Sequence, residues 1–168
     1  PYEATAVARL LDAGALVVGR TNVDEFRLGA TTETSVHGAT RHPLDRSRSP
    51  GGAAGGAAAA VAAGVVRVAL AIDTGGGVRH PAAWCGVVGL RPTYGRVSRH
   101  GLVALASSMD TVGILARTVD ETALVLSLIA GRDPFDPTSA DLEVPPYRVA
   151  ESALDAQQPL AGLVVGRP

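Results

Sequence analysis

Two glycine-rich stretches carry the residues of this sequence that are best suited to chemistry on a small ligand. The first, SPGGAAGGA, runs from Ser49 to Ala57, and the second, DTGGG, runs from Asp73 to Gly77. Glycine allows the backbone to approach a ligand closely. The two stretches therefore predict a site in which backbone amides are directed at a ligand. A phosphate-binding loop is not expected, because GxxxxGK[ST] requires a lysine and a hydroxyl that the first stretch lacks.

Other side chains offer weaker candidates for a nucleophile or a metal ligand. Cys85 is the only thiol, and His80 lies five residues before it, which is a poor spacing for a pair on one helix. We interpret Cys85 as a buried structural thiol. We interpret Ser107 and Ser108 as structural hydrogen-bonding residues, since no base is placed to activate them. The four histidines show no metal-ligand spacing: they are His37, His42, His80 and His100.

Composition limits the classes of function. The chain has 168 residues, of which 46% are hydrophobic, and a net charge of −1, which gives no reason to expect direct nucleic-acid binding. All 15 basic residues are arginine, so no lysine is present to act as a base. The long apolar run Val61–Ile72 is interrupted by Gly64 and Arg67, so no membrane span is expected. A single cysteine favours a reducing, cytoplasmic location.

The first half of the chain predicts elements that flank the first glycine-rich stretch. Helical spacing of apolar residues predicts a helix over Glu3–Ala13 that ends at Gly14. Residues Ala15–Gly19 predict a short buried strand, and Thr21–Asp24 resembles a capping box that would begin a helix running to Leu28. The polar stretch Ala30–Ser49, with its arginines at 41, 46 and 48, predicts a solvated surface loop.

The second half alternates helices and strands, which favours an α/β layered domain. We expect helices over Ala57–Ala63, Arg79–Cys85 and Thr118–Ala130. The last of these should be capped by Thr118 and Glu121, bury a stripe of Val119, Ala123, Leu126 and Ala130, and end at Gly131. We expect a buried strand over Val65–Ile72, and short strands over Val87–Leu90, Arg96–Ser98, Ile114–Ala116 and from Leu160 to Gly166. A Pro- and Asp-rich surface connection should follow Gly131.

Long runs of this sequence resemble the amidase-signature family, and within it the amidotransferase A subunits. The resemblance is carried by GRTNVDEF, ATTETSVHGATRHPLD, SPGGAAGG, DTGGGVRHPAAWCGVVGLRPTYGRVSRHGLVALASSMD and VGILARTVDETALVLSLIAGRDPFDPTS. It implies a mixed β-sheet core covered by helices. It also implies that residues 1–168 are the middle of a single, incomplete domain, truncated at both ends.

The family's chemistry is acyl transfer by a Ser–Ser–Lys triad, and this chain departs from it at each member. The family pattern GGSSGGSAA corresponds to the stretch that begins at Gly51, which puts Ala53 in place of the serine that lies in a cis peptide. The pattern DTGGS puts Gly77 in place of the nucleophile, and the lysine would precede Pro1. For the remaining residues of the site, the resemblance implies that the backbone of the second turn is kept. Its possible oxyanion donors are Thr74, Gly75, Gly76 and Gly77, and the residues that frame them are Asp73, Arg79 and Pro81.

Three hypotheses follow from these departures. The first is that the chain is a catalytically silent amidase-like domain. The second is that it is a module that binds a carbonyl or carboxylate, or one that a partner chain completes. The third is that it is part of an active amidotransferase of this family. The resemblance implies a small amide or glutamine as ligand, and no cofactor or metal. It implies other amidotransferase subunits as partners, while sheet edges left open by truncation would favour self-association.

Overall fold

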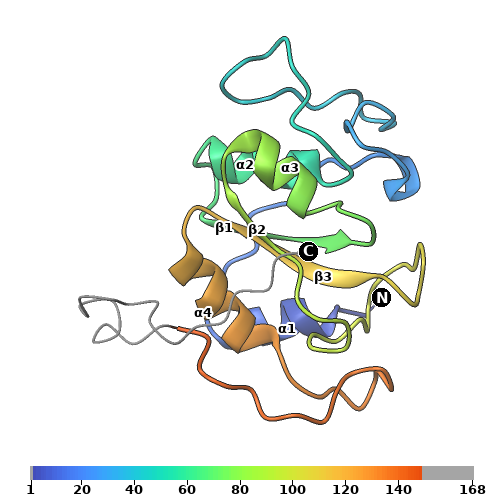
Figure 1. Ribbon diagram of the computed structural model, residues 1–168, viewed down its shortest axis with the longest axis vertical. Helices are drawn as coiled ribbons and strands as arrows, with labels where there is room; N and C mark the ends of the chain where they lie inside the picture. Colours follow the sequence, from blue (N-terminus) through green and yellow to red (C-terminus); the bar gives the residue numbers. More distant parts are fainter. Residues whose placement is uncertain (1, 149–168) are drawn as a thin grey trace, which may run out of the picture.

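The computed structural model describes residues 2–148, which form a small sheet between two layers of helices. The sheet has three antiparallel strands in the order β1-β3-β2, with β1 spanning Val68–Asp73, β2 Val88–Leu90 and β3 Thr111–Ala116. Along β1, the register runs from Val68 opposite Ala116 to Asp73 opposite Thr111. Helices α2 and α3 lie on one face of the sheet, and α1 and α4 lie on the other (Figure 1).

The central strand β3 divides the core into two clusters because side chains on a strand alternate between its faces. Val112 and Ile114 pack with α1 (Thr5–Asp12) and α4 (Val119–Ile129), and Leu115 packs with α2 (Gly55–Ala62) and α3 (Arg79–Cys85). The second cluster is built almost entirely from small side chains, which let α2 approach the sheet closely. The two glycine-rich stretches lie at the ends of elements in this second layer, where α2 begins and where β1 leads into α3.

Most of the expected helices are confirmed. Residues 79–85 form α3 with the predicted bounds, α1 is followed by Gly14 at a positive φ, and α2 begins two residues earlier than expected. The Thr118 hydroxyl caps α4 by accepting a hydrogen bond from the Glu121 N–H at 3.2 Å. The predicted stripe of α4 is wrong at its first member, because Val119 is exposed, and Val125 and Ile129 join the buried face instead.

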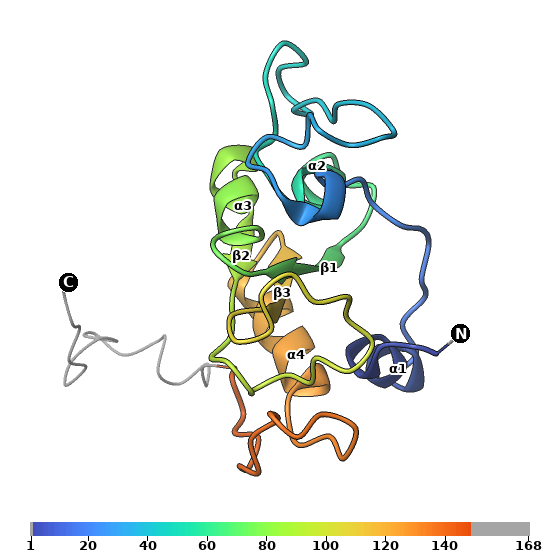
Figure 2. The same ribbon diagram turned by 90° about the vertical axis from the view of Figure 1, so that its right-hand side faces the viewer.

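The expected strands are confirmed only in part. Residues 15–19 form no strand, and their apolar side chains are exposed, with Leu16 at 89% of its full accessibility. No strand within residues 2–148 pairs with this segment, which runs apart from the sheet in Figure 2. The other expected strands are shifted or reduced. Strand β1 starts at Val68 and is half-buried, β3 starts at Thr111, and residues 96–98 make only an isolated bridge from Val97 to Ala130.

Two further loop predictions have mixed outcomes. The Thr21–Asp24 capping box is wrong: a single 3-10 turn, η1, spans Glu25–Arg27, and no side chain caps it. The Asp24 carboxylate instead accepts hydrogen bonds from Thr32 and Thr34 across the loop. Residues 30–49 contain no helix or strand, as predicted, but Thr32 among them is completely buried rather than solvated. The described part of the connection after Gly131 also contains no helix or strand, although Asp133 and Asp136 in it are buried. The strand expected from residue 160 to 166 lies outside the described residues.

Candidate functional site

The first glycine-rich loop is held from behind by residues that the sequence did not single out. The buried hydroxyl of Thr32 donates to the Gly51 carbonyl at 2.7 Å and accepts from the Gly55 N–H at 3.1 Å, so it joins the two ends of the loop. The Asp24 N–H donates to the Ala53 carbonyl at 3.1 Å. Residues distant in sequence therefore fix the backbone on either side of Ala53.

The second glycine-rich loop folds around the carboxylate of Asp73, which is completely buried at the end of β1. The N–H groups of Gly76, Val78 and Arg79 donate to it at 2.8, 3.2 and 3.1 Å. The Arg79 guanidinium donates two more hydrogen bonds, at 3.1 and 2.9 Å, and Arg91 lies 3.5 Å away. One side chain thus determines the path of the backbone from the strand into α3.

The hydrogen bonds to Asp73 also decide its charge. Burial acts to raise the pKa of this carboxyl, but the hydrogen bonds from Arg79 and from the N–H groups of Gly76 and Val78 outweigh burial. The pKa of Asp73 is therefore held below its ordinary value, and the carboxylate is ionised at neutral pH. The side chains of Asp73 and Arg79 accordingly organise the loop by pairing with one another.

The two loops meet at positions 53 and 77, the two positions at which the resemblance implies serines. The Ala54 N–H donates to the Gly77 carbonyl at 3.1 Å. A Cβ atom placed on Gly77 would lie 3.8 Å from the Cβ atom of Ala53, so side chains at these positions would be in direct contact. The peptide bond from Gly52 to Ala53 is cis, as the resemblance implies. Neither residue carries a group that could act as nucleophile or relay a proton.

Backbone donors remain available in the second loop. Within residues 2–148, the N–H groups of Thr74, Gly75 and Gly77 have no hydrogen-bond partner, whereas that of Gly76 is engaged by Asp73. These residues are exposed or half-buried, so a ligand can reach the turn. Three of the four oxyanion donors expected from the resemblance thus have an N–H group that an acceptor could bind.

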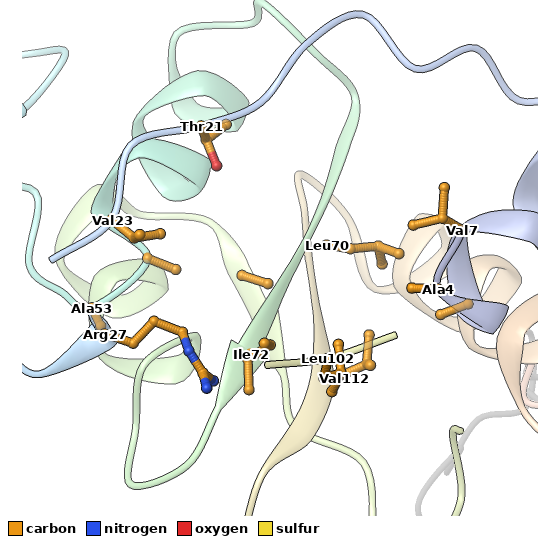
Figure 3. A pocket seen from close by; sticks show the side chains of 13 residues that line it. Ala4, Val7, Thr21, Val23, Arg27, Ala53, Leu70, Ile72, Leu102 and Val112 are labelled. Carbon is orange, nitrogen blue, oxygen red and sulfur yellow. The ribbon is translucent and has the colours of Figure 1, made fainter. Parts of the chain in front are cut away.

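A cavity of about 250 Å³ adjoins the first loop. Its wall includes Ala53 together with apolar side chains of the sheet, Leu70, Ile72 and Val112. Figure 3 shows the Arg27 side chain extending into this region between Ala53 and Ile72. The cavity is therefore largely apolar with one cationic group.

Residues outside the two motifs complete the site. Asp110 is buried and accepts a hydrogen bond from the Thr74 hydroxyl, which anchors the start of the second loop. Burial acts to raise the pKa of Asp110. The hydrogen bond from Thr74, which is the largest opposing effect, acts with further hydrogen bonds and the charge of Arg27 to lower the pKa below its ordinary value. His80 bonds to the Gly52 carbonyl at 3.1 Å through Nδ1 and so links α3 to the first loop. These contacts could not be predicted from the sequence, because only the fold brings the residues together.

The weaker candidates lie away from a reactive arrangement. Cys85 is buried, as expected, and burial raises the pKa of its thiol to about 11. Ser107 and Ser108 are exposed. Within residues 2–148, no group of three or more His, Cys, Asp and Glu side chains could hold a metal ion. The helices of the same residues include none that is both long and apolar enough to cross a bilayer.

Comparisons with known proteins agree on one family. The Amidase family model matches residues 1–168. The chain is 56% identical to the A subunit of glutamyl-tRNA(Gln) amidotransferase from Synechococcus sp. (strain RCC307), over 99% of its own length and 33% of the relative's. It is also 56% identical to the protein of that name from Carboxydothermus hydrogenoformans, covering 100% of this chain and 34% of the relative. The chain spans about a third of the length of the curated relatives it matches.

Solved structures give the same result. The crystal structure of the glutamyl-tRNA(Gln) amidotransferase A subunit from Thermotoga maritima matches with a TM-score of 0.83 and 51% identity, over 84% of this chain and 31% of that one. The structure of 6-aminohexanoate cyclic dimer hydrolase matches with a TM-score of 0.83 and 39% identity, over 93% of this chain and 33% of that one. The mixed α/β fold is therefore that of a portion of these enzymes.

Proposed function

The chain belongs to the amidase family, and from that premise we propose that it is a catalytically silent part of a single, incomplete amidase domain. The observation that carries this proposal is the contact between positions 53 and 77. The residues there, Ala53 and Gly77, have no reactive atom, although their backbone is placed so that side chains would touch. A glycine at position 77 cannot attack a carbonyl, and an alanine at position 53 cannot relay a proton.

The expected loss of activity is large. Removal of the nucleophile from a comparable triad lowers kcat by about 10⁶-fold. Oxyanion stabilisation and binding alone retain only about 10³- to 10⁴-fold catalysis over water. The N–H groups of Thr74, Gly75 and Gly77 would then bind a carbonyl oxygen without leading to cleavage. An arginine cannot replace the missing base, because its pKa keeps it protonated.

An assay of ammonia release by the purified chain tests this proposal. We expect no release from glutamine or from a simple primary amide above the rate without protein. Variants with Ala53→Ser, Gly77→Ser and both substitutions should be equally inactive, because the chain contains no lysine. Ammonia release by the unsubstituted chain that persists at constant specific activity through further purification would overturn the proposal.

A second proposed function is assembly with a partner chain, and the exposed segment at residues 16–18 favours it. Leu16, Val17 and Val18 are 89%, 64% and 74% exposed, and β1 is an edge strand of the described sheet. Such features favour pairing with another strand. The relatives are named as subunits, so a different subunit of such an amidotransferase is the partner we propose.

Light scattering tests the assembly proposal. The purified chain should self-associate at high concentration or should form a complex with a candidate subunit, and Leu16→Asn with Val18→Asn should weaken that association. A chain that stays monomeric and binds no subunit would contradict it. The third possibility, an active amidotransferase of which this chain is a part, predicts a lysine encoded upstream in the same reading frame.

A further inference from the structure

The cavity beside Ala53 touches both faces of strand β1. Leu70 and Ala71 both line it, although successive side chains of a strand point to opposite faces of the sheet. Leu70 packs against the core cluster on the α1 and α4 side, and Ala71 packs against the cluster on the α2 and α3 side. One edge of β1 is paired with β3. A cavity that reaches both faces of the strand therefore passes around its other edge.

This other edge of β1 has no partner within residues 2–148. Apart from the pairing with β3, the backbone of residues 68–72 makes no backbone hydrogen bond in the part of the chain that the structure describes. The strand also lacks the features that protect an exposed edge, because the sequence of these five residues, VALAI, contains no charge, proline or glycine. An edge without such protection is a template for pairing with another strand.

Beyond this edge the cavity continues between the two layers of the molecule. Ala4 and Val7 form its wall on the α1 side, and Val23 and Ala53 form its wall on the side of the first glycine-rich loop. Figure 3 shows these two walls on either side of the β1 ribbon. The open edge therefore borders an apolar space of about 250 Å³ that lies between the layers.

A second backbone without a strand partner borders the cavity at Thr21. The segment 16–20 that precedes Thr21 has the apolar, β-branched composition of a strand and makes no hydrogen bond to any other described residue. In Figure 2 this segment runs from α1 to η1 and stands apart from the sheet. The cavity thus lies between β1 and the end of a segment that could also accept a strand.

We propose that this cavity is a slot for one additional β-strand, supplied by a partner chain, that pairs with β1 on one side and with residues 16–20 on the other. Main-chain hydrogen bonds to both neighbours would provide the affinity. Because the two layers cover both faces of the slot, the strand must carry apolar side chains at successive positions and no charge at its centre. Strand β1 has six residues, so a strand of similar length fills the slot.

A second copy of this chain cannot supply the strand. Its β1 is held between its own helical layers, and its segment 16–20 is tied down at both ends. The Ala15 N–H donates to the Leu10 carbonyl at 2.9 Å, and the Asn22 carbonyl accepts from the Gly56 N–H at 3.1 Å. Neither backbone is free to enter the slot of another copy, so the strand comes from a different polypeptide.

This inference rests on the second proposed function, assembly with a partner chain, and specifies the contact. The chain matches 33% and 34% of two curated relatives, so about two thirds of each relative is further polypeptide beside the matching region. Assembly is measured on whole subunits, whereas strand insertion is measured with a short peptide. Subunit association without peptide binding would overturn the slot and leave the assembly proposal standing, and peptide binding without subunit association would do the reverse.

A peptide titration followed by NMR tests the inference. The probe is the acetylated and amidated peptide Lys-Val-Ala-Val-Ala-Val-Lys, whose terminal lysines keep it soluble. It should bind the purified chain and protect the amide hydrogens of residues 16–20 from exchange. Its matched controls carry N-methyl groups on one or the other alternate set of amides. Because alternate amides of a strand point to opposite sides, methylation of either set should weaken binding about tenfold or more.

Substitutions in the chain locate the bound peptide. Val7→Phe narrows the cavity from the α1 side and should weaken binding, whereas Val119→Phe, the same replacement at an exposed position outside the cavity wall, should not. Val17→Pro and Val18→Pro remove successive N–H groups that bond to no described residue, so both variants should fold. One of the two should weaken binding more than the other, because only one of these N–H groups points into the slot.

Several results would each overturn the inference. They are no binding of the peptide, sensitivity to only one set of methyl groups, and unchanged binding to Val7→Phe. A dimer of the chain alone that Val7→Phe disrupts would also overturn it, because the slot would then hold a second copy. If Val7→Phe does not fold, the Val17→Pro and Val18→Pro titrations decide the question, and equal binding to both would contradict the slot.

Discussion

The two glycine-rich loops are held by groups within the described chain, whereas the segment 16–20 makes no hydrogen bond to any other described residue. The loops have few apolar side chains, yet Asp73 and Thr32 fix their backbone through hydrogen bonds. The segment has the apolar and β-branched side chains of a strand, yet no strand within residues 2–148 lies beside it. The difference shows that β-forming composition becomes a strand only beside a partner, whereas a loop can be ordered by one buried polar group.

Among the substitutions that test this comparison, Asp73→Asn should have the largest effect on stability. The substitution removes the charge from a fully buried acceptor of five hydrogen bonds, so we expect a loss of about 3 kcal/mol in the free energy of unfolding. Urea denaturation followed by circular dichroism measures it. Asp45→Asn is the control, since the half-exposed Asp45 carboxylate bonds to its near neighbours Ser47 and Arg48 within the surface loop, so its substitution should cost much less. Equal losses in the two variants would show that Asp73 does not order the loop.

A pH titration of stability examines the same carboxylate without substitution. The pKa of Asp73 is lower in the folded chain than in the unfolded chain, so its contribution is present above the ordinary pKa of about 4 and disappears as the pH falls through the depressed value. Unfolding free energy should therefore decline at acidic pH, and Asp73→Asn should decline less steeply. Identical slopes for the two proteins would contradict the assignment.

Glycines 75 and 77 provide a smaller, matched test of how tightly the second loop is packed. A Cβ atom on Gly77 would lie 2.9 Å from the Ile72 carbonyl oxygen, whereas one on Gly75 would meet no atom within 4 Å. We expect Gly77→Ala to cost about 1–2 kcal/mol of unfolding free energy and Gly75→Ala to cost much less. If both substitutions are tolerated equally in urea denaturation, the loop is looser than described.

The smallest effect is expected from Leu16→Asn in the unpartnered segment. Leu16 makes little packing contact because 89% of its surface is exposed, so its replacement should change the unfolding free energy of the monomer by less than about 0.5 kcal/mol. Thermal denaturation at low protein concentration checks this. A clear destabilisation of the monomer would show that the segment is buried in solution.

The sequence predicted the helices better than the strands, for a physical reason. Capping residues and helical spacing are local features of the sequence. They therefore predicted α3 over Arg79–Cys85 and the start of α4 after Thr118. A strand depends on its neighbour: Ala15–Gly19 has strand composition but no partner among the described residues, and Val65 lies outside β1 because only residues 68–73 face β3.

The candidate site was predictable where its residues are consecutive in the sequence. Through the resemblance, the DTGGG motif singled out Asp73 and the possible backbone donors that follow it. The motif could not identify Arg27, Asp110 or Thr32, which lie on separate loops and reach the site only through the tertiary fold. The hydrogen bond from the Gly76 N–H to the Asp73 carboxylate could not be predicted either, because it depends on the conformation of the Asp73 side chain.

The central claim is that the frame of the site stands without its reactive groups, and amide hydrogen exchange of the unsubstituted chain tests it most directly. The N–H groups of Ala54, Val78 and Arg79, which are hydrogen-bonded across or within the two loops, should be protected, while those of residues 16–18 should exchange at the rate of an unstructured peptide. Fast exchange in both regions would contradict the claim, because the two loops would then not be held by their hydrogen bonds.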